Sequence, residues 1–274
     1  MINEILSILR EHGISLAAPI SLKDCVITHG YKLERAGFDN TAELTAIMIA
    51  VPYLTAQDKK NISSYAVCRD YHDYFAQLFA SIIPVLKETF PSHHFAGFAD
   101  NSPISERDAA AMAGLGIIGD NGMLITEKYS SYVFLGEIIT DIPTTAITSP
   151  IGHCIGCGAC KKACPMDKIG VCLSALTQKK GVLNPDEEQA ILSFGSVWGC
   201  DICQEVCPYT KKAIKAGTIY TNIDYFKKEL IPLLTREDID KMSDTEFSQR
   251  AYSWRGKAVI SRNLTLMENS KKSD

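Results

Sequence analysis

Residues 154–165 read CIGCGACKKACP, and residues 200–208 read CDICQEVCP. The first stretch has the spacing C-x2-C-x2-C-x3-C-P, and the second stretch repeats its last three cysteines and the proline. Bacterial proteins bind pairs of [4Fe–4S] clusters with this spacing: three cysteines of a run bind one cluster, and the fourth binds the other. The two stretches therefore predict a domain built around two iron–sulfur clusters.

Two such clusters need eight thiolates, of which the two stretches supply seven. Cys172 is the remaining cysteine in this region and completes the set. Because ligands cross between the clusters, we assign Cys154, Cys157, Cys160 and Cys207 to one cluster, and Cys164, Cys172, Cys200 and Cys203 to the other. Cys25 and Cys68 lie outside the region and are expected to be ordinary buried thiols.

Zinc sites and disulfides also use cysteine, but both fit this sequence poorly. Zinc favours separated pairs of cysteines around one tetrahedral ion, which a four-cysteine run does not match. Disulfides form in oxidising compartments, and the apolar N-terminus contains Glu4, Arg10 and Glu11, unlike a secretory signal. No run reaches the roughly 18 apolar residues of a membrane span. We expect a cytoplasmic protein with no membrane partner.

The composition is that of a globular protein, with 46% hydrophobic and 22% charged residues in a chain of 274. Residues 1–150 hold 10 Lys and Arg against 17 Asp and Glu, giving −7, whereas residues 151–274 hold 18 against 15, giving +3. The net charge of −4 excludes a protein that coats nucleic acid over its whole surface. The mildly basic second part is either a solvated surface or one that meets phosphates locally.

Hydrophobic spacing predicts helices and strands before the cysteines and helices after them. Helices are expected at 2–12, 71–88, 105–113, 223–234 and 236–250, and strands at 46–53, 122–126 and 132–140. Residues 114–119 fit the dinucleotide fingerprint G-x-G-x-x-G, but a helix precedes them where that motif needs a strand. A glycine-rich helix end is the favoured interpretation, and the elements indicate a first domain of α/β or α+β type.

The chain resembles the epoxyqueuosine reductases over about residues 45–265. The residues that carry the resemblance are Arg69-Asp70-Tyr71-His72, Asp100 with Ser102-Pro103 and Glu106-Arg107, Phe134-Leu135-Gly136-Glu137, the cysteine region, and Ser253-Trp254-Arg255-Gly256-Lys257. The resemblance implies an α+β fold, in which a nitroreductase-like cobalamin-binding domain precedes a bacterial ferredoxin-like two-cluster domain. We expect the cobalamin- and substrate-binding domain at 1–145, the two-cluster domain at 146–215, and a C-terminal helical segment with a basic tail at 216–274.

The resemblance also implies a reaction. The clusters pass electrons to cobalamin, and epoxyqueuosine in tRNA is reduced by two electrons to queuosine with loss of water. The expected partners are the anticodon loop of tRNA and an external electron donor of the flavodoxin or ferredoxin type, and the expected state is a monomer. Two other functions stay open: a cobalamin-dependent reductase of a small molecule, and a two-cluster electron-transfer protein without its own substrate.

The resemblance further implies site residues by position. Asp100 stands where the family has its proton donor, and an apolar corrin beside it is expected to raise the pKa of its carboxyl group. Without the resemblance, Asp100 would be interpreted as a loop carboxylate that caps the following helix. Cobalamin contacts are expected at Ser63, Asp100, Leu124, Leu135, Ser174 and Asp201. Lys180 matches a position near tRNA.

Two further side chains have more than one interpretation. His72 is expected to satisfy local hydrogen bonds rather than to touch the chemistry. Arg262 either binds phosphate or pairs with acidic residues of the protein.

Overall fold

The structure is a computed structural model that describes residues 1–39, 43–166 and 170–270. The chain forms two compact units: the first consists of Met1–Pro52 and Tyr71–Gly156, and the second of Tyr53–Asp70 and Cys157–Asp274. The expected boundary at residue 145 lies near the last of these crossings. The expected domains place Tyr53–Asp70 in the first domain, whereas this segment belongs to the second unit. They also place a boundary at residue 215, inside the range Cys157–Asp274 that belongs to one unit.

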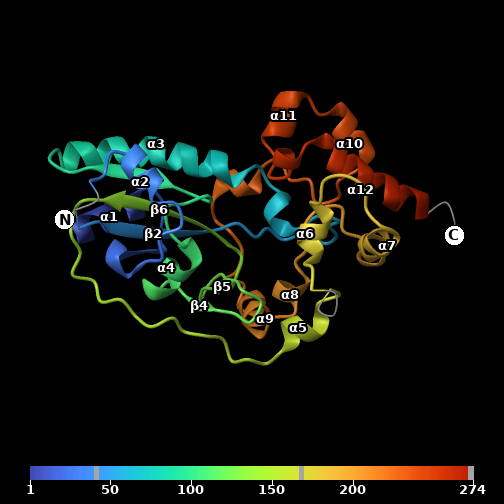
Figure 1. The fold of residues 1–274 in the computed structure, drawn as a ribbon, viewed down its shortest axis with the longest axis horizontal. Coiled ribbons are helices and arrows are strands. Elements are labelled where there is room, and N and C mark those ends of the chain that lie inside the picture. Colours follow the sequence, from blue (N-terminus) through green and yellow to red (C-terminus); the bar gives the residue numbers. More distant parts are fainter. Residues whose placement is uncertain (40–42, 167–169, 271–274) are drawn as a thin grey trace. The chain divides into compact units, whose positions relative to one another are not determined.

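The first unit contains a four-stranded antiparallel sheet of strand order β1-β2-β6-β3 and a separate β4-β5 hairpin. Its elements are α1 (Ile2–Glu11), β1 (Ala17–Ser21), η1 (Leu22–Asp24), α2 (Tyr31–Arg35), β2 (Thr45–Pro52), α3 (Tyr71–Thr89), β3 (Phe95–Phe98), α4 (Glu106–Met112), β4 (Ile117–Ile118), β5 (Leu124–Ile125) and β6 (Val133–Thr140). The sheet lies between α3 and α4 (Figure 1). The helices and strands expected in this part of the chain are therefore confirmed, with ends shifted by a few residues.

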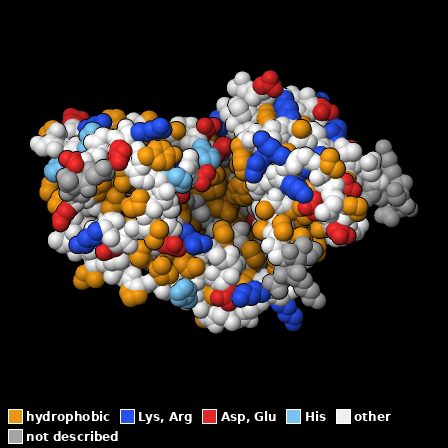
Figure 2. Space-filling view, viewed as in Figure 1, with side chains coloured by type: hydrophobic (Ala, Val, Ile, Leu, Met, Phe, Trp, Pro, Cys, Tyr) orange, Lys and Arg blue, Asp and Glu red, His pale blue; other side chains and the backbone are white. Residues whose placement is uncertain are grey.

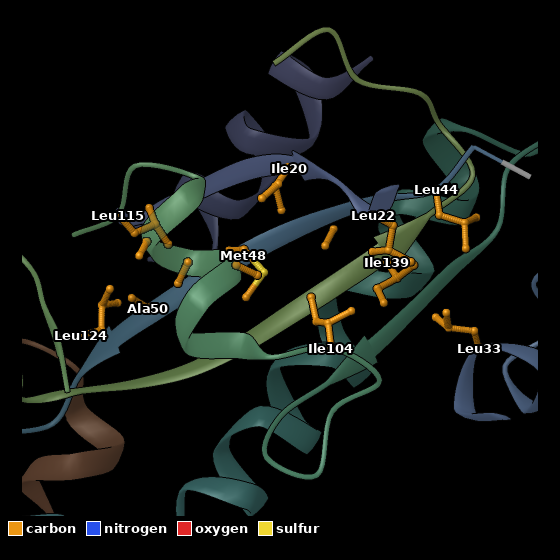
Figure 3. Close-up of a cluster of buried hydrophobic side chains, with 14 of the residues drawn as sticks. Ile20, Leu22, Leu33, Leu44, Met48, Ala50, Ile104, Leu115, Leu124 and Ile139 are labelled. Carbon is orange, nitrogen blue, oxygen red and sulfur yellow. The ribbon is translucent and has the colours of Figure 1, made fainter. Parts of the chain in front are cut away.

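The central strand β2 is buried along its whole length because helices cover both faces of the sheet. Ala46, Met48 and Ala50 point to the α4 face and join a buried apolar cluster, which contains side chains of the sheet, of α4 and of the segments between them (Figure 3). On the other face, α3 approaches the sheet so closely that a Cβ atom at Gly136 would lie 2.5 Å from the ring of Phe75. Glycine in β6 therefore allows the helix to pack directly on the strand.

The second unit is helical. Its elements are η2 (Ser64–Ala66), α5 (Ala159–Ala163), α6 (Leu173–Thr177), α7 (Pro185–Phe194), α8 (Ile202–Glu205), α9 (Pro208–Lys215), η3 (Asp224–Lys227), α10 (Arg236–Lys241), α11 (Asp244–Ser248), η4 (Ser253–Arg255) and α12 (Lys257–Ser270). In the described ranges, no helix is long and apolar enough to cross a membrane.

The segment Tyr53–Asp70 is held in the second unit by backbone hydrogen bonds on two sides. The N–H of Ser63 donates to the carbonyl of Trp198 at 2.7 Å, and the N–H of Val197 donates to the carbonyl of Asn61, also at 2.7 Å. Trp198 is fully buried beside this segment, in an apolar cluster that also contains Ile62 and Ala66. The segment is thus part of the core of the second unit.

The prediction of a helix at 223–234 is wrong, since only the short 3-10 turn η3 forms there. Pro232 has no N–H to donate to a helix. The N–H of Ile231 donates to the carbonyl of Val67 at 2.9 Å, and that of Leu234 donates to the side chain of Asn61 at 2.8 Å. The backbone of this stretch therefore bonds to the segment Tyr53–Asp70 instead of to itself.

The predicted helix at 236–250 is two helices, α10 and α11, and each begins with its own capping box. Thr235 and Asp238 form the first box, and Ser243 and Glu246 form the second. A capping box satisfies the free N–H groups of a helix start. The second box therefore marks a new helix in the middle of the predicted one.

Gly199 packs closely against Ser63 in the second unit. Its backbone has φ +72°, and a Cβ atom there would lie 2.5 Å from Cβ of Ser63. We expect Gly199→Ala to destabilise the protein by about 1–3 kcal/mol through overpacking, in addition to the ~1 kcal/mol for a left-handed alanine. Gly195→Ala is the matched control, because Gly195 has φ +60° but no atom within 4 Å of the added Cβ. Thermal unfolding of the purified protein measures both; equal melting temperatures would contradict the close approach.

Candidate functional site

Asp100 lies in the loop of residues 99–105 between β3 and α4, which we call the Asp100 loop. Its carboxyl oxygen Oδ2 lies 3.3 Å from Nε2 of His72, near the start of α3, and the two side chains are 61% and 49% exposed. Asp100 and Asn101 have φ values of 54° and 25°, in the left-handed region that residues other than glycine rarely adopt. The loop thus presents a carboxyl group to solvent beside an imidazole.

The hydrogen bond with His72 lowers the pKa of the Asp100 carboxyl group; partial burial acts in the opposite direction, and the backbone of Asn101 lowers the pKa further. The expected rise of this pKa depends on an apolar corrin beside Asp100 and stays a prediction. Donors that face a carboxylate stabilise its charged form. The His72 imidazole is in direct contact with this carboxyl group.

Backbone and side-chain contacts hold the Asp100 loop on several sides. The carbonyl of Ser102 accepts a hydrogen bond from the hydroxyl of Thr28 at 2.9 Å, and Nδ1 of His29 lies 3.0 Å from the same oxygen. The ammonium of Lys32 donates to the carbonyl of Asn101. These contacts connect the loop to residues 28–32, for which no role in the site was predicted.

The predicted cluster cysteines lie at or near the ends of short helices. Cys160 is in α5 and Cys203 is in α8, and these two helices pack against each other. Cys164 ends α5, Cys172 precedes α6, and Cys207 precedes α9. The sulfur of Cys154, in the first unit, accepts the N–H of Asp120 at 3.4 Å, while Cys157 is exposed.

Three thiols of the second assigned cluster lie close together. Burial raises the pKa of Cys200, and the nearby Asp201, Cys172 and Cys164 raise it further. Across the described residues, no three His, Cys, Asp or Glu side chains converge on a single metal ion. A [4Fe–4S] cube binds its thiolates at four separate irons, so its ligands do not converge on one point. The chemistry of this donor set fits such a cluster.

Ser63 and Asp201, two of the expected cobalamin contacts, are brought together in the second unit. The hydroxyl of Ser63 donates to Oδ1 of Asp201, and the N–H of Ser64 donates to Oδ2 at 2.7 Å. Lys60 pairs with Asp201 and also with Glu205, at 2.9 Å. This network borders a pocket of about 180 Å³ that Cys200 also lines. It fixes a buried carboxylate next to Cys200, a predicted cluster ligand.

The ion pairs with Lys60 change the titration of that lysine. Burial lowers the pKa of the ammonium, but Asp201 and then Glu205 raise it, and the net direction is upward. Lys60 therefore stays charged and neutralises the carboxylate of Asp201.

The other expected cobalamin contacts lie in different settings. Leu124 in β5 is buried and its side chain points into the α4 cluster (Figure 3). Leu135 in β6 is half-buried against the same cluster. Ser174 in α6 is half-buried, and its hydroxyl accepts a hydrogen bond from Gln178 at 3.0 Å. The side chain of Leu124 is therefore part of the core, and its backbone is paired with that of Ile118 in the β4-β5 hairpin.

Lys180 is exposed on the loop after α6, and Arg262 of α12 holds that loop. One nitrogen of Arg262, Nη1, donates to the carbonyls of Lys179 and Gly181, each at 2.7 Å. Neither predicted role of Arg262 includes this contact with backbone carbonyls. On the visible face near α6 to α12, lysine and arginine side chains lie among acidic and apolar ones (Figure 2).

Comparison with known proteins adds to this geometry. The family model for a 4Fe-4S double cluster binding domain matches residues 153–210, which contain all eight predicted cluster ligands. The "Epoxyqueuosine reductase" of Listeria monocytogenes is 34% identical over 208 residues, which cover 72% of this chain and 54% of the relative. The chain therefore spans about half the length of that relative.

A second relative is matched over more of its length. The "Epoxyqueuosine reductase" of Gloeobacter violaceus is 31% identical over 218 residues, which cover 75% of this chain and 68% of the relative. Among solved structures, an epoxyqueuosine reductase with an epoxyqueuosine-modified tRNA-Tyr stem loop is 25% identical, with a TM-score of 0.76 over 97% of this chain and 80% of that chain. The predicted α+β fold with a two-cluster domain is confirmed.

Proposed function

Because the chain belongs to the epoxyqueuosine reductase family, we propose that it reduces epoxyqueuosine in tRNA to queuosine. Members of this family use two [4Fe–4S] clusters and cobalamin, the cofactors expected from the sequence. The reaction consumes two electrons and two protons. Both C–O bonds of the epoxide break, the oxygen leaves as water, and a carbon–carbon double bond forms.

The residues of the chain take separate roles in this proposal. The eight cysteines hold the clusters in the two assigned groups, and Ser63, Asp100, Leu124, Leu135, Ser174 and Asp201 contact cobalamin. When bound, cobalamin supplies cobalt chemistry at the epoxide carbon, with electrons that the clusters deliver one at a time. An external donor of the flavodoxin or ferredoxin type supplies the electrons to the clusters.

Asp100 and His72 carry the proposal, because Asp100 stands where the family has its proton donor and an electron carrier without a substrate needs no such acid. We infer that Asp100 donates a proton to the departing epoxide oxygen. Its carboxyl group is exposed, and His72 is positioned 3.3 Å away to return a proton to it. Proton transfer by a positioned side chain typically contributes about 10²–10⁴-fold to a rate.

We propose that the enzyme is a monomer, that its partner is the anticodon loop of tRNA with Lys180 near the tRNA backbone, and that its location is the cytoplasm. We expect Lys180→Glu to weaken the binding of an epoxyqueuosine-modified stem loop. The slope of log affinity against log salt concentration should also become smaller by about 1. Lys87→Glu is the control for net charge, since Lys87 is exposed on α3 of the first unit. Equal slopes for both variants would remove Lys180 from the interface.

The experiment that tests the function is nucleoside analysis of tRNA from a strain that lacks the gene. We expect epoxyqueuosine to accumulate and queuosine to disappear, and a plasmid copy of the gene to reverse both changes. A strain with unchanged queuosine would remove the assignment to tRNA. To distinguish reduction of tRNA from reduction of a small molecule, the purified protein is given either the modified stem loop or the free epoxyqueuosine nucleoside. Reduction of the free nucleoside alone would favour the small-molecule alternative.

A further inference from the structure

Two carboxyl groups lie behind the Asp100 loop, and one of them is in the middle of the sheet. Glu137 of β6 is fully buried and is paired in register with Met48 of β2 and Phe98 of β3. Glu106 is the first residue of α4, the helix that packs on this face of the sheet, and is half-buried. A carboxylate among such neighbours is costly unless it is paired or protonated.

The hydrogen bonds of Glu137 leave one oxygen that needs a proton. Its Oε1 accepts a hydrogen bond from the hydroxyl of Ser102. Its Oε2 is buried and receives no hydrogen bond from any group in the described residues, although Glu106 lies within hydrogen-bonding reach of the same carboxyl group. Two ionised carboxylates only accept hydrogen bonds. A single proton between Glu106 and Glu137 satisfies both.

Electrostatics favours the same arrangement. Burial raises the pKa of Glu137 well above its ordinary value, and the charge of Glu106 raises it further. Burial also raises the pKa of Glu106, to about 7. Other titratable or charged side chains also face the pair. Asp100 raises the pKa of Glu106, and His72 lowers it. Lys32 lowers the pKa of Glu137, and Cys25 also interacts with Glu137.

Each member of the pair holds one residue of the Asp100 loop. Oε1 of Glu106 accepts the backbone N–H of Asp100 at 3.1 Å, where the chain has its left-handed turn. Ser102, which donates its hydroxyl proton to Glu137, accepts the N–H of Ile104 at 3.1 Å through the same oxygen. The loop conformation therefore depends on both carboxyl groups.

We propose that Glu106 and Glu137 share one proton and are positioning residues that keep the Asp100 loop closed. The catalytic meaning of this closure rests on the proposed function, but the closure itself does not. When the shared proton is lost, two negative charges face each other in a buried site. Glu106 then turns towards solvent, and the N–H of Asp100 loses its acceptor.

The direction of the pH dependence follows from the two states of the loop. In the open loop Glu106 is in water, with an ordinary pKa of 4.5, while Glu137 stays buried in the sheet; in the closed loop the pKa of Glu106 is about 7. Between these values the closed loop binds one more proton than the open loop, so closure weakens about tenfold per pH unit as the pH rises. Above this window the dependence levels off.

Hydrogen–deuterium exchange of peptides that cover residues 99–105 tests the proposal with the full-length protein. After correction for the intrinsic exchange rate, we expect protection to fall about 40-fold between pH 5 and pH 7. Glu137→Gln keeps the acceptor for Ser102 and donates a permanent N–H to Glu106, so this variant is expected to show no such fall. Glu106→Gln serves as the second variant, because it keeps the acceptor for Asp100 and donates to Glu137.

Glu127→Gln is the matched control, since Glu127 is exposed in the turn after β5 and should retain the wild-type fall. His29 and His72 also contact the loop, and the glutamine variants keep both imidazoles. A pH dependence that came from an imidazole would therefore survive in the variants. Constant protection in the wild type, or an equal fall in both glutamine variants, would overturn the proposal. No tRNA enters this measurement, so its outcome is independent of the reaction assigned above.

Discussion

Asp100→Asn is expected to lower the turnover of epoxyqueuosine-modified tRNA by about 10²–10⁴-fold. Asparagine keeps the size and hydrogen-bonding shape of the side chain but has no acidic proton to transfer. Binding of cobalamin and assembly of the clusters should be unchanged, because the other proposed contacts and all eight cysteines remain. Anaerobic turnover, measured as queuosine formed per enzyme with cobalamin and iron contents determined on the same sample, checks this result.

Asp141→Asn is the matched control for Asp100→Asn. Asp141 pairs with His93 in the first unit, with Oδ1 2.9 Å from Nδ1, so the control removes a second carboxylate–histidine pair. Its turnover should equal that of the wild type. Full activity of Asp100→Asn would show that the proton comes from another group.

Cys172→Ser is expected to remove one of the two clusters, so that iron falls from about eight to about four per chain. Serine is a poor replacement for a thiolate ligand, and Cys172 is the eighth ligand in the assignment. Cys172 and Cys164 both lie near Cys200, so the lost cluster should be the one that these residues share. Loss of a cluster also removes folding free energy, and a lower melting temperature should accompany the loss of iron.

Cys25→Ser is the control for the cysteine variant. Burial, with smaller contributions from Asp24 and Glu137, raises the pKa of Cys25 to about 12, so this residue is a neutral thiol. Metals bind the thiolate form. Iron content should therefore be unchanged in Cys25→Ser. Iron that stays near eight per chain in Cys172→Ser would contradict the assigned ligand set.

The cysteine framework was predictable because its information is local. Ligand spacing of two or three residues is fixed by the geometry of a cluster and can be read directly from the sequence. The same holds for α3, whose apolar residues recur at helical spacing, and for β2, whose continuous apolar run predicted a buried strand. The proposed cluster ligands needed no knowledge of the fold.

Contacts between distant residues were not predictable in this way. His72 was expected only to make local hydrogen bonds, but the fold brings it to Asp100, 28 positions away. Glu137 and Glu106 were noticed only as part of a resemblance, since a single sequence does not show which acidic residues of a strand and a helix start will be buried together. A glutamate within the apolar run of β6 was the one available signal, because such positions are rarely charged.

The error at residues 223–234 has the same origin. Apolar residues there suggested a helix, but their backbone groups bond to the segment Tyr53–Asp70, more than 150 positions earlier in the chain. Tertiary hydrogen bonds override weak helix propensity in such a stretch. The passage of Tyr53–Asp70 into the second unit also places Ser63 beside Asp201, and no local pattern in either segment indicated that contact.

The most direct test is an anaerobic assay of the purified chain that has been reconstituted with iron, sulfide and cobalamin. An epoxyqueuosine-modified stem loop and a low-potential reductant are added, and the nucleosides are quantified. We predict one queuosine for every two electrons consumed, with no product when cobalamin is omitted. A preparation with both clusters and bound cobalamin that forms no queuosine would contradict the proposed function.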